Sequence, residues 1–234
     1  MTITLITFDL DNTLWDVEPA LVRAEQEQQA WLARHRPRAG EGLDDESLLA
    51  FKKAVWKRNP DLAHDVTAMR RRMLYELQRE AAYSHSEATT GTAAAFEVFL
   101  EERQQVDLYP GALEVLQHLA GRYTLAALTN GNADIFKTDA APYFTFALRA
   151  EDIGAAKPEP DMFHAALERA GASADQAVHV GDDPNHDIYG AHNAGLRSVW
   201  FNNRDRPWSD GAPPHAEITH LSELADVLAN WTAR

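Results

Sequence analysis

Three short apolar segments that each end directly in a polar turn constrain the fold of this chain more than any other feature. They lie at residues 3–8, 123–128 and 177–180, and residues 197–201 and 145–148 are similar in composition. Short runs rich in apolar and β-branched side chains, closed by turn residues, are typical of buried strands. The sequence therefore predicts five strands, of which three lead into a polar loop.

Helical patterns lie between the predicted strands. Apolar side chains recur at helical spacing over residues 113–119, 162–170 and 221–231. Residues 187–193 lack a strong apolar stripe but follow Pro184, a favourable residue in the first turn of a helix. Strands that alternate with helices predict an α/β fold, with a Rossmann-like parallel sheet and right-handed crossovers. Such sheets bind ligands beyond the carboxyl ends of their strands.

The segment between the first two predicted strands has no strand pattern. Apolar side chains recur there at helical spacing in four places, at residues 21–32, 48–55, 66–77 and 96–100. We therefore expect an all-helical insertion over residues 18–104, with an α/β core made of residues 1–17 and 105–234. Residues 40–45 are expected to form a loop within the insertion.

Composition excludes several classes of function. The formal net charge of −14 disfavours nucleic acid and anionic membranes as partners, because both attract positive surfaces. No apolar run approaches the roughly 20 residues of a membrane-spanning helix, and the N-terminus lacks the basic region of a signal peptide. The chain has no cysteine, so a disulfide, a thiolate metal site and a cysteine nucleophile are excluded. A cytoplasmic location is the simplest expectation.

Two aspartates, Asp9 and Asp11, directly follow the first predicted strand. Carboxylates this close repel each other, which favours a hard cation between them. Magnesium prefers oxygen ligands and keeps water and substrate phosphate in its shell. A carboxylate can also act as a nucleophile that divides one difficult displacement into two easier ones. The alternative is an Asx turn with two solvated aspartates, and this motif alone does not decide between them.

A second acidic loop follows the strand predicted at residues 177–180. It places Asp182, Asp183 and Asp187 where the first acidic loop should arrive. Crowded carboxylates raise one another's pKa unless a cation is present. The alternative is a helix N-terminus, where the helix dipole favours acidic residues; it accounts well for Asp187 and less well for Asp182.

Two further segments could contact a phosphate. The turn Thr129-Asn130-Gly131 offers a hydroxyl and backbone N–H groups that can cradle an anion, although such turns are common. Lys157 lies in a proline-stiffened loop before a predicted helix. A lone lysine is usually a solvated surface charge, but near several carboxylates it can neutralise both phosphate and nucleophile.

In this order, the motifs resemble those of the haloacid dehalogenase superfamily of phosphotransferases. The likeness covers nearly the whole chain and rests on residues 9–13, Thr129, Lys157 and residues 181–187. The helical insertion resembles the small helical C1 cap of this superfamily. The resemblance therefore implies a catalytic core at residues 1–17 and 105–234 and a helical cap at residues 18–104.

The resemblance also assigns roles to side chains. It implies that Asp9 attacks phosphorus and that Asp11 protonates the leaving oxygen and then deprotonates water. It implies that Mg²⁺ binds the Asp9 carboxylate, the Asp11 backbone carbonyl and Asp182. Thr129 and Lys157, with the adjoining Asn130, would hold the phosphoryl oxygens.

Two more carboxylates have weaker assignments. Asp187 would support the metal from outside its first shell of ligands, and the same role is considered for Asp183. Asp11 also disfavours dehalogenation, because the dehalogenases of the superfamily lack the second aspartate.

Four segments resemble the bacterial flavin-pathway phosphatases, which act on FMN and on the phosphorylated ribitylamino-uracil precursor of riboflavin. They are residues 64–67, 129–133, 148–150 and 179–183. The expected activity is therefore hydrolysis of a small-molecule phosphate ester. A phosphomutase or phosphonate hydrolase on the same fold remains an alternative, and a non-catalytic metabolite-binding protein is a further one.

Overall fold

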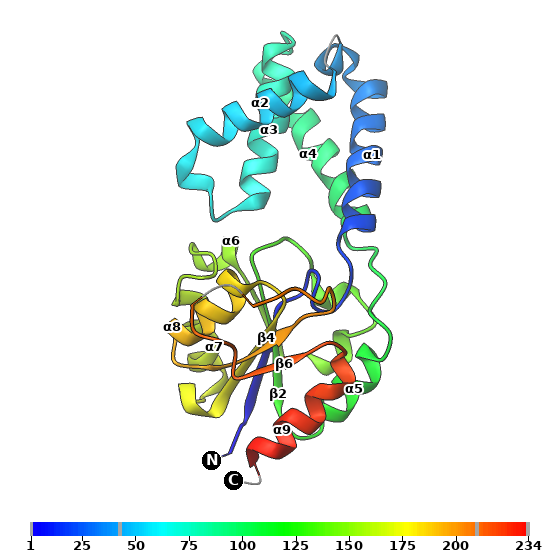
Figure 1. Cartoon of the computed structure of the whole chain (residues 1–234). Helices are drawn as coiled ribbons and strands as arrows, with labels where there is room; N and C mark the ends of the chain where they lie inside the picture. Colours follow the sequence, from blue (N-terminus) through cyan, green and yellow to red (C-terminus); the bar gives the residue numbers. More distant parts are fainter. Residues whose placement is uncertain (1, 42–43, 209–210, 233–234) are drawn as a thin grey trace. The chain divides into compact units, whose positions relative to one another are not determined.

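A computed structural model describes residues 2–41, 44–208 and 211–232 of the chain (Figure 1). The chain divides into two compact units. One is an α/β unit made of Met1–Val17 and Val106–Arg234, and the other is a helical unit made of Glu18–Gln105.

A six-stranded parallel sheet forms the centre of the α/β unit, in the order β3-β2-β1-β4-β5-β6. The strands are β1 (Leu5–Phe8), β2 (Thr124–Thr129), β3 (Phe146–Arg149), β4 (Ala177–Gly181), β5 (Arg197–Phe201) and β6 (Ala216–Ile218). The predicted parallel α/β sheet is confirmed, and its five predicted strands are all present. The edge strand β6 was not predicted.

Helices cover both faces of the sheet (Figure 1). Ile6 and Phe8 pack in one apolar cluster with α5 (Ala112–Ala120) and α9 (Leu224–Thr232). Leu5 packs in a second cluster with α7 (Asp161–Ala170) and α8 (Gly190–Asn193). This division follows from the strand period of two, which sends successive side chains to opposite faces. Burying each large apolar side chain contributes about 1.5–3 kcal/mol.

Shorter helical segments join these elements. They are α6 (Ala150–Ile153), η3 (Ile135–Lys137), η4 (Ala141–Tyr143), η5 (Ala174–Gln176), η6 (Pro184–Tyr189) and η7 (Leu221–Glu223). The helix expected over residues 187–193 is instead a π-helical turn, η6, followed by α8. The reason is local: the Asp183 carboxylate accepts hydrogen bonds from the N–H groups of Asn185 and His186, so the turn begins at Pro184.

The helical unit contains α1 (Glu18–His35), α2 (Asp45–Arg58), α3 (Val66–Glu80) and α4 (His85–Arg103), with short turns η1 (Pro37–Gly40) and η2 (Pro60–Leu62). Its described residues include no strand, as the sequence pattern predicted. Side-chain caps fix three helix starts: Asp44 caps α2, Asp65 caps α3 and Ser84 caps α4. The middle of the loop expected at residues 40–45 lies outside the described residues.

The core of the helical unit joins α1, α3 and α4. Its buried side chains are Ala24, Leu32, Leu74, Ala95, Phe96 and Phe99. A run of three arginines at residues 70–72 lies on α3. Arg71 and Arg72 are exposed, but Arg70 is partly buried, with its guanidinium 3.7 Å from the centre of the Phe99 ring. Within the described part of the chain, no helix is both long and apolar enough to span a bilayer.

Candidate active site

Polar loops follow three neighbouring strands at one edge of the sheet. Asp9 follows β1, Asn130 follows β2 and Asp182 follows β4. The strand order is β2-β1-β4 and all three strands are parallel, so these loops lie at the same end of the sheet. The chain continues from β1 to β2 on one side and from β4 to β5 on the other, and the loops meet at the point between these two directions. That is the position at which α/β sheets bind ligands.

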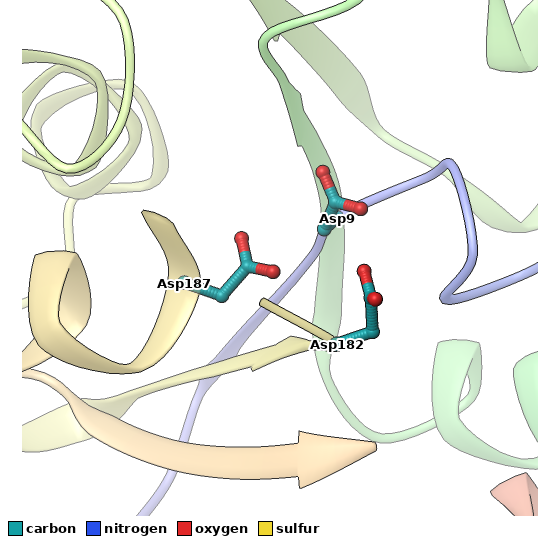
Figure 2. Close-up of side chains that lie close together, drawn as sticks. All are labelled: Asp9, Asp182 and Asp187. Carbon is teal, nitrogen blue, oxygen red and sulfur yellow. The ribbon is translucent and has the colours of Figure 1, made fainter. Parts of the chain in front are cut away.

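Three carboxylates converge at this edge. Figure 2 shows the side chains of Asp9, Asp182 and Asp187 lying close together. One oxygen from each lies within 4.8 Å of the others, and Asp9 and Asp187 are buried. Asp187 comes from η6, directly after the second acidic loop. The structure therefore brings together the two acidic loops that the sequence placed at one site.

The ammonium group of Lys157 joins two of these carboxylates. Its Nζ atom donates hydrogen bonds to Asp9 Oδ1, Asp187 Oδ1 and the carbonyl oxygen of Leu128, each at 2.7 Å. The residue is only 2% exposed. An ammonium group has three donors, so all three have acceptors here. Lys157 is therefore a buried member of the cluster rather than a solvated surface charge.

The loop after β1 folds back through Trp15. The indole N–H of Trp15 donates to Asp11 Oδ1 at 2.8 Å, and the N–H of Asn12 donates to the Trp15 carbonyl at 2.7 Å. Asn12 has a φ of 63°, in the left-handed region that asparagine tolerates better than most residues. Trp15 is fully buried, so it anchors the loop and holds one oxygen of Asp11.

Thr129 and Asn130 shape the turn after β2. The Thr129 hydroxyl accepts a hydrogen bond from the N–H of Gly131 at 2.9 Å. The Asn130 side chain bonds the backbone of Lys157 twice, since its Oδ1 accepts from the Lys157 N–H and its Nδ2 donates to the Lys157 carbonyl, each at 2.8 Å. Asn130 thereby holds the lysine loop, and direct contact between its side chain and a phosphate stays a prediction.

Comparison with known proteins decides the family. The family model described as haloacid dehalogenase-like hydrolase matches residues 3–195. The chain belongs to the haloacid dehalogenase-like hydrolases. The family resemblance in the motifs is thus confirmed.

Individual relatives of this hydrolase carry different names. The chain is 34% identical over 230 residues to the 5-amino-6-(5-phospho-D-ribitylamino)uracil phosphatase YigB of Escherichia coli, covering 97% of this chain and 96% of that protein. It is 34% identical over 158 residues to a phosphoserine phosphatase of Thermus thermophilus, covering 64% of each chain. A crystal structure described as a 2-haloacid dehalogenase from Pseudomonas syringae matches with a TM-score of 0.94 and 44% identity, covering 98% of this chain and 100% of that one.

Burial sets the charge balance of the site in this haloacid dehalogenase-like hydrolase. Burial raises the pKa of Asp9 well above its usual value, although Lys157 opposes this. Burial and the charge of Asp187 raise the pKa of Asp182 to about 7. Both shifts mean that the carboxylate form is disfavoured where it stands. A cation bound beside Asp9 and Asp182 would oppose both shifts.

Asp187 and Lys157 behave in the opposite way, because each stabilises the charge of the other. Burial alone would raise the pKa of Asp187, but Lys157 and the His179 ring N–H hold it well below its usual value. Burial alone would lower the pKa of Lys157, but Asp187 and Asp9 raise it. This ion pair is thus stable at neutral pH.

The carboxylates of this hydrolase fit a hard divalent cation. Both oxygens of Asp187 already accept hydrogen bonds, from Lys157 and from the Asp183 N–H. The second oxygen of Asp9 meets the Thr13 hydroxyl at a longer 3.3 Å, and Asp182 Oδ2 lies 3.5 Å from Arg206. The oxygens best placed for a cation therefore belong to Asp9 and Asp182, a donor set that suits Mg²⁺.

Sequence reasoning did not identify several residues around the site. Thr7, His179 and Arg206 were not singled out for a role there. Thr7 and His179 left a signal, because both are polar residues inside otherwise apolar strands. Arg206, whose guanidinium donates to the Asp182 carbonyl at 2.6 Å, lies in a polar loop that offered none.

Proposed function

We propose that this chain is a Mg²⁺-dependent phosphomonoester hydrolase that forms an aspartyl-phosphate on Asp9. One observation carries the proposal: the buried Asp9 carboxylate is held by the Lys157 ammonium and lies within 4.8 Å of the Asp182 and Asp187 carboxylates. Phosphoryl transfer depends mainly on positioning and on neutralising charge, and this cluster supplies both.

The roles of the side chains follow from their contacts. The Asp9 carboxylate, which Lys157 holds through Oδ1, is proposed to attack phosphorus with one oxygen while its other oxygen binds Mg²⁺. Asp11 is proposed to protonate the leaving alcohol oxygen and then to deprotonate the water that attacks the aspartyl-phosphate. The Trp15 indole N–H donates to Asp11 Oδ1 and so orients this carboxylate for the proposed proton transfer.

Charge neutralisation is divided between the protein and the ion. Thr129, Asn130 and Lys157 are proposed to hold the phosphoryl oxygens, and this requires the Lys157 ammonium to share its donors with the substrate. The Asp9 carboxylate, the Asp11 carbonyl and Asp182 are the proposed ligands of Mg²⁺. When bound, Mg²⁺ would neutralise the developing charge on the phosphoryl group.

Asp11 favours phosphate esters over halogenated acids as substrates. A halide leaves as a stable anion and needs no proton, whereas an alkoxide leaving group needs an acid. Hydrolysis of a phosphate ester is therefore proposed for this chain, and not the dehalogenation named for the Pseudomonas syringae protein. The resemblance to the Escherichia coli phosphatase supports a substrate related to the phosphorylated ribitylamino-uracil precursor of riboflavin, with FMN as a second candidate.

The helical unit, the partner and the cellular location also have proposed assignments. Glu18–Gln105 is proposed to act as a cap that excludes water during the reaction. The partner is a small phosphorylated metabolite, without nucleic acid or membrane, and the proposed location is the cytoplasm. A phosphonate hydrolase is not favoured, because its imine needs a buried lysine in the helical unit. Lys53 and Lys57 of that unit are exposed, and the Lys52 side chain is 35% exposed.

Substitution of Asp9 tests the proposed function. Asp9→Asn keeps the shape of the side chain and removes the nucleophile, so it should abolish Mg²⁺-dependent release of phosphate from an aryl phosphate. Asp175→Asn is the matched control, because Asp175 is exposed and precedes β4, at the opposite end of the sheet. Full activity of Asp9→Asn would refute the assignment of the nucleophile.

A phosphate-release screen tests the substrate class. FMN, the ribitylamino-uracil phosphate, nucleotides and sugar phosphates would be compared by kcat/KM, each with Mg²⁺ and with a chelator. A clear preference for the ribitylamino-uracil phosphate is the expected result. A preference for nucleotides or for sugar phosphates would contradict the flavin-pathway proposal while leaving the chemistry intact.

A further inference from the structure

A histidine with no part in the proposed chemistry lies beneath the active site. His179, on β4, is fully buried, and so is Thr7, its register partner on the neighbouring strand β1. Both side chains lie on the sheet face covered by α7, where the Phe163 ring packs edge-on against the His179 ring with centroids 5.0 Å apart. An apolar side chain would fill this place in the core, so the choice of histidine needs another reason.

Hydrogen bonds give that reason. His179 Nε2 lies 3.1 Å from Asp187 Oδ1, and His179 Nδ1 lies 2.8 Å from the Thr7 hydroxyl. An ionised carboxylate can only accept, so Nε2 must carry a proton and donate to Asp187. Burial lowers the pKa of His179, which favours the neutral ring. Nδ1 is then an acceptor, and the Thr7 hydroxyl donates to it at 2.8 Å rather than to the Val178 carbonyl oxygen, which lies farther away at 3.3 Å. This hydrogen bond keeps the proton on Nε2.

Asp187 is the point where this chain of hydrogen bonds meets the active site. Its Oδ1 accepts from both His179 and Lys157, and its Oδ2 accepts from the N–H of Asp183 at 2.9 Å. One carboxylate thus orients the lysine that holds Asp9 and the loop that carries Asp182. The His179 N–H is the third donor that fixes this buried carboxylate, beside Lys157 and the Asp183 N–H.

We infer that His179 is a positioning residue of the active site, which holds the Asp187 carboxylate in the orientation that directs Lys157 toward Asp9. The inference rests on the proposed phosphatase function and deepens it. The Thr7 hydroxyl supports His179 by keeping the proton on Nε2. Donors of this kind, one step removed from the reacting groups, typically change activity or metal affinity by about 10- to 100-fold when they are lost.

A set of substitutions separates positioning from packing. His179→Leu removes both ring nitrogens at similar volume, whereas His179→Gln places an amide N–H near the position of Nε2 and keeps a donor for Asp187. Phe163→Leu is the matched control, because it loosens the packing around the ring and removes none of these hydrogen bonds. Thr7→Val removes only the hydroxyl and serves if His179→Leu does not fold.

Steady-state kinetics with an aryl phosphate and saturating Mg²⁺ give the first readout. His179→Leu should lower kcat by about 10- to 100-fold with little change in KM, and His179→Gln should recover most of the loss. Thr7→Val should lower kcat less, and Phe163→Leu should lower thermal stability while keeping kcat. Wild-type kcat in both His179→Leu and Thr7→Val would overturn the inference, and so would an equal loss in Phe163→Leu and His179→Leu.

The imidazole spectrum gives a second readout that does not depend on turnover. Long-range ¹H–¹⁵N correlation spectra of the full chain, assigned by comparison with His179→Gln, should show the His179 proton on Nε2 and none on Nδ1. A proton on Nδ1 would overturn the inference. An inactive wild-type protein would instead contradict the proposed phosphatase function, and the spectrum would then decide the role of His179 by itself.

Discussion

Replacing Lys157 with methionine tests how strongly the active-site cluster depends on its internal cation. Methionine has a similar length and volume, so the apolar contacts of the stem are largely kept. The change removes three hydrogen bonds of 2.7 Å and leaves the Asp9 and Asp187 carboxylates without the ammonium between them. Leaving one member of a buried ion pair without its partner costs about 3–5 kcal/mol.

Hydrogen exchange measured by mass spectrometry reports the loss in stability of the α/β unit separately from the helical unit. At about 1.4 kcal/mol per factor of ten, a loss of 3–5 kcal/mol accelerates exchange of the slowest amides in β1 and β4 by roughly 100- to 5,000-fold. The measurement is made with a chelator, because a bound divalent cation would replace part of the lost charge.

Lys137→Met is the matched control for this experiment. Lys137 is exposed, and substitutions at such positions usually change stability by less than about 0.5 kcal/mol. Exchange in Lys137→Met should therefore match the wild type. If Lys157→Met accelerated exchange no more than Lys137→Met does, the account of a cluster stabilised by its buried lysine would be refuted.

Two other predictions follow from contacts in the α/β unit. Trp15→Phe removes the N–H that donates to Asp11 Oδ1 and should lower kcat about 10-fold or more with KM unchanged, as measured with an aryl phosphate; an unchanged kcat would show that the indole does not orient Asp11. His215 is the subject of the second. Burial, with His192 and Arg197 nearby, lowers the pKa of His215, and its Nδ1 accepts from the Ser198 N–H. The unfolded state then binds protons first as pH falls below about 6.5, so stability present above that pH is lost on acidification. His215→Asn should show a smaller drop in melting temperature between pH 7.5 and 5.5 than the wild type, and an equal drop would contradict this.

The sheet could be predicted because its strands are short, apolar and closed by turns. The pattern located β5 at residues 197–201, the range found in the structure, and placed the other four predicted strands within two residues of their observed bounds. β6 was missed because it has only three residues and lies at the sheet edge, after two prolines. Such a strand pairs through its backbone and leaves no apolar run to detect.

The site could be predicted in outline and not in detail. Parallel topology alone brings the loops after β1 and β4 together, so Asp9 and Asp182 could be placed at one edge from the order of the motifs. The burial of Lys157 could not be predicted, because it depends on a contact between residues 148 positions apart. The same holds for Asn130, whose side chain holds the backbone of Lys157, since no sequence pattern reports that pairing.

His179 could be predicted from the sequence in part. A polar residue inside an apolar strand signals that a hydrogen-bond partner is required, because an unpaired buried polar group is costly. The partner itself emerges only from the register of β1 with β4 and from the turn of η6, which delivers Asp187. The sequence therefore indicates that His179 requires a hydrogen-bond partner, but it does not indicate which residue that partner is.

Chemical trapping of the covalent intermediate is the most direct test of the central claim. The protein would be mixed with Mg²⁺ and a phosphate ester, quenched in acid within one turnover and treated with borohydride, which reduces an acyl phosphate to an alcohol. Peptide mass spectrometry should then find homoserine in place of Asp9, only when substrate was present. Modification at a different carboxylate, or an unmodified Asp9 during active turnover, would contradict the account.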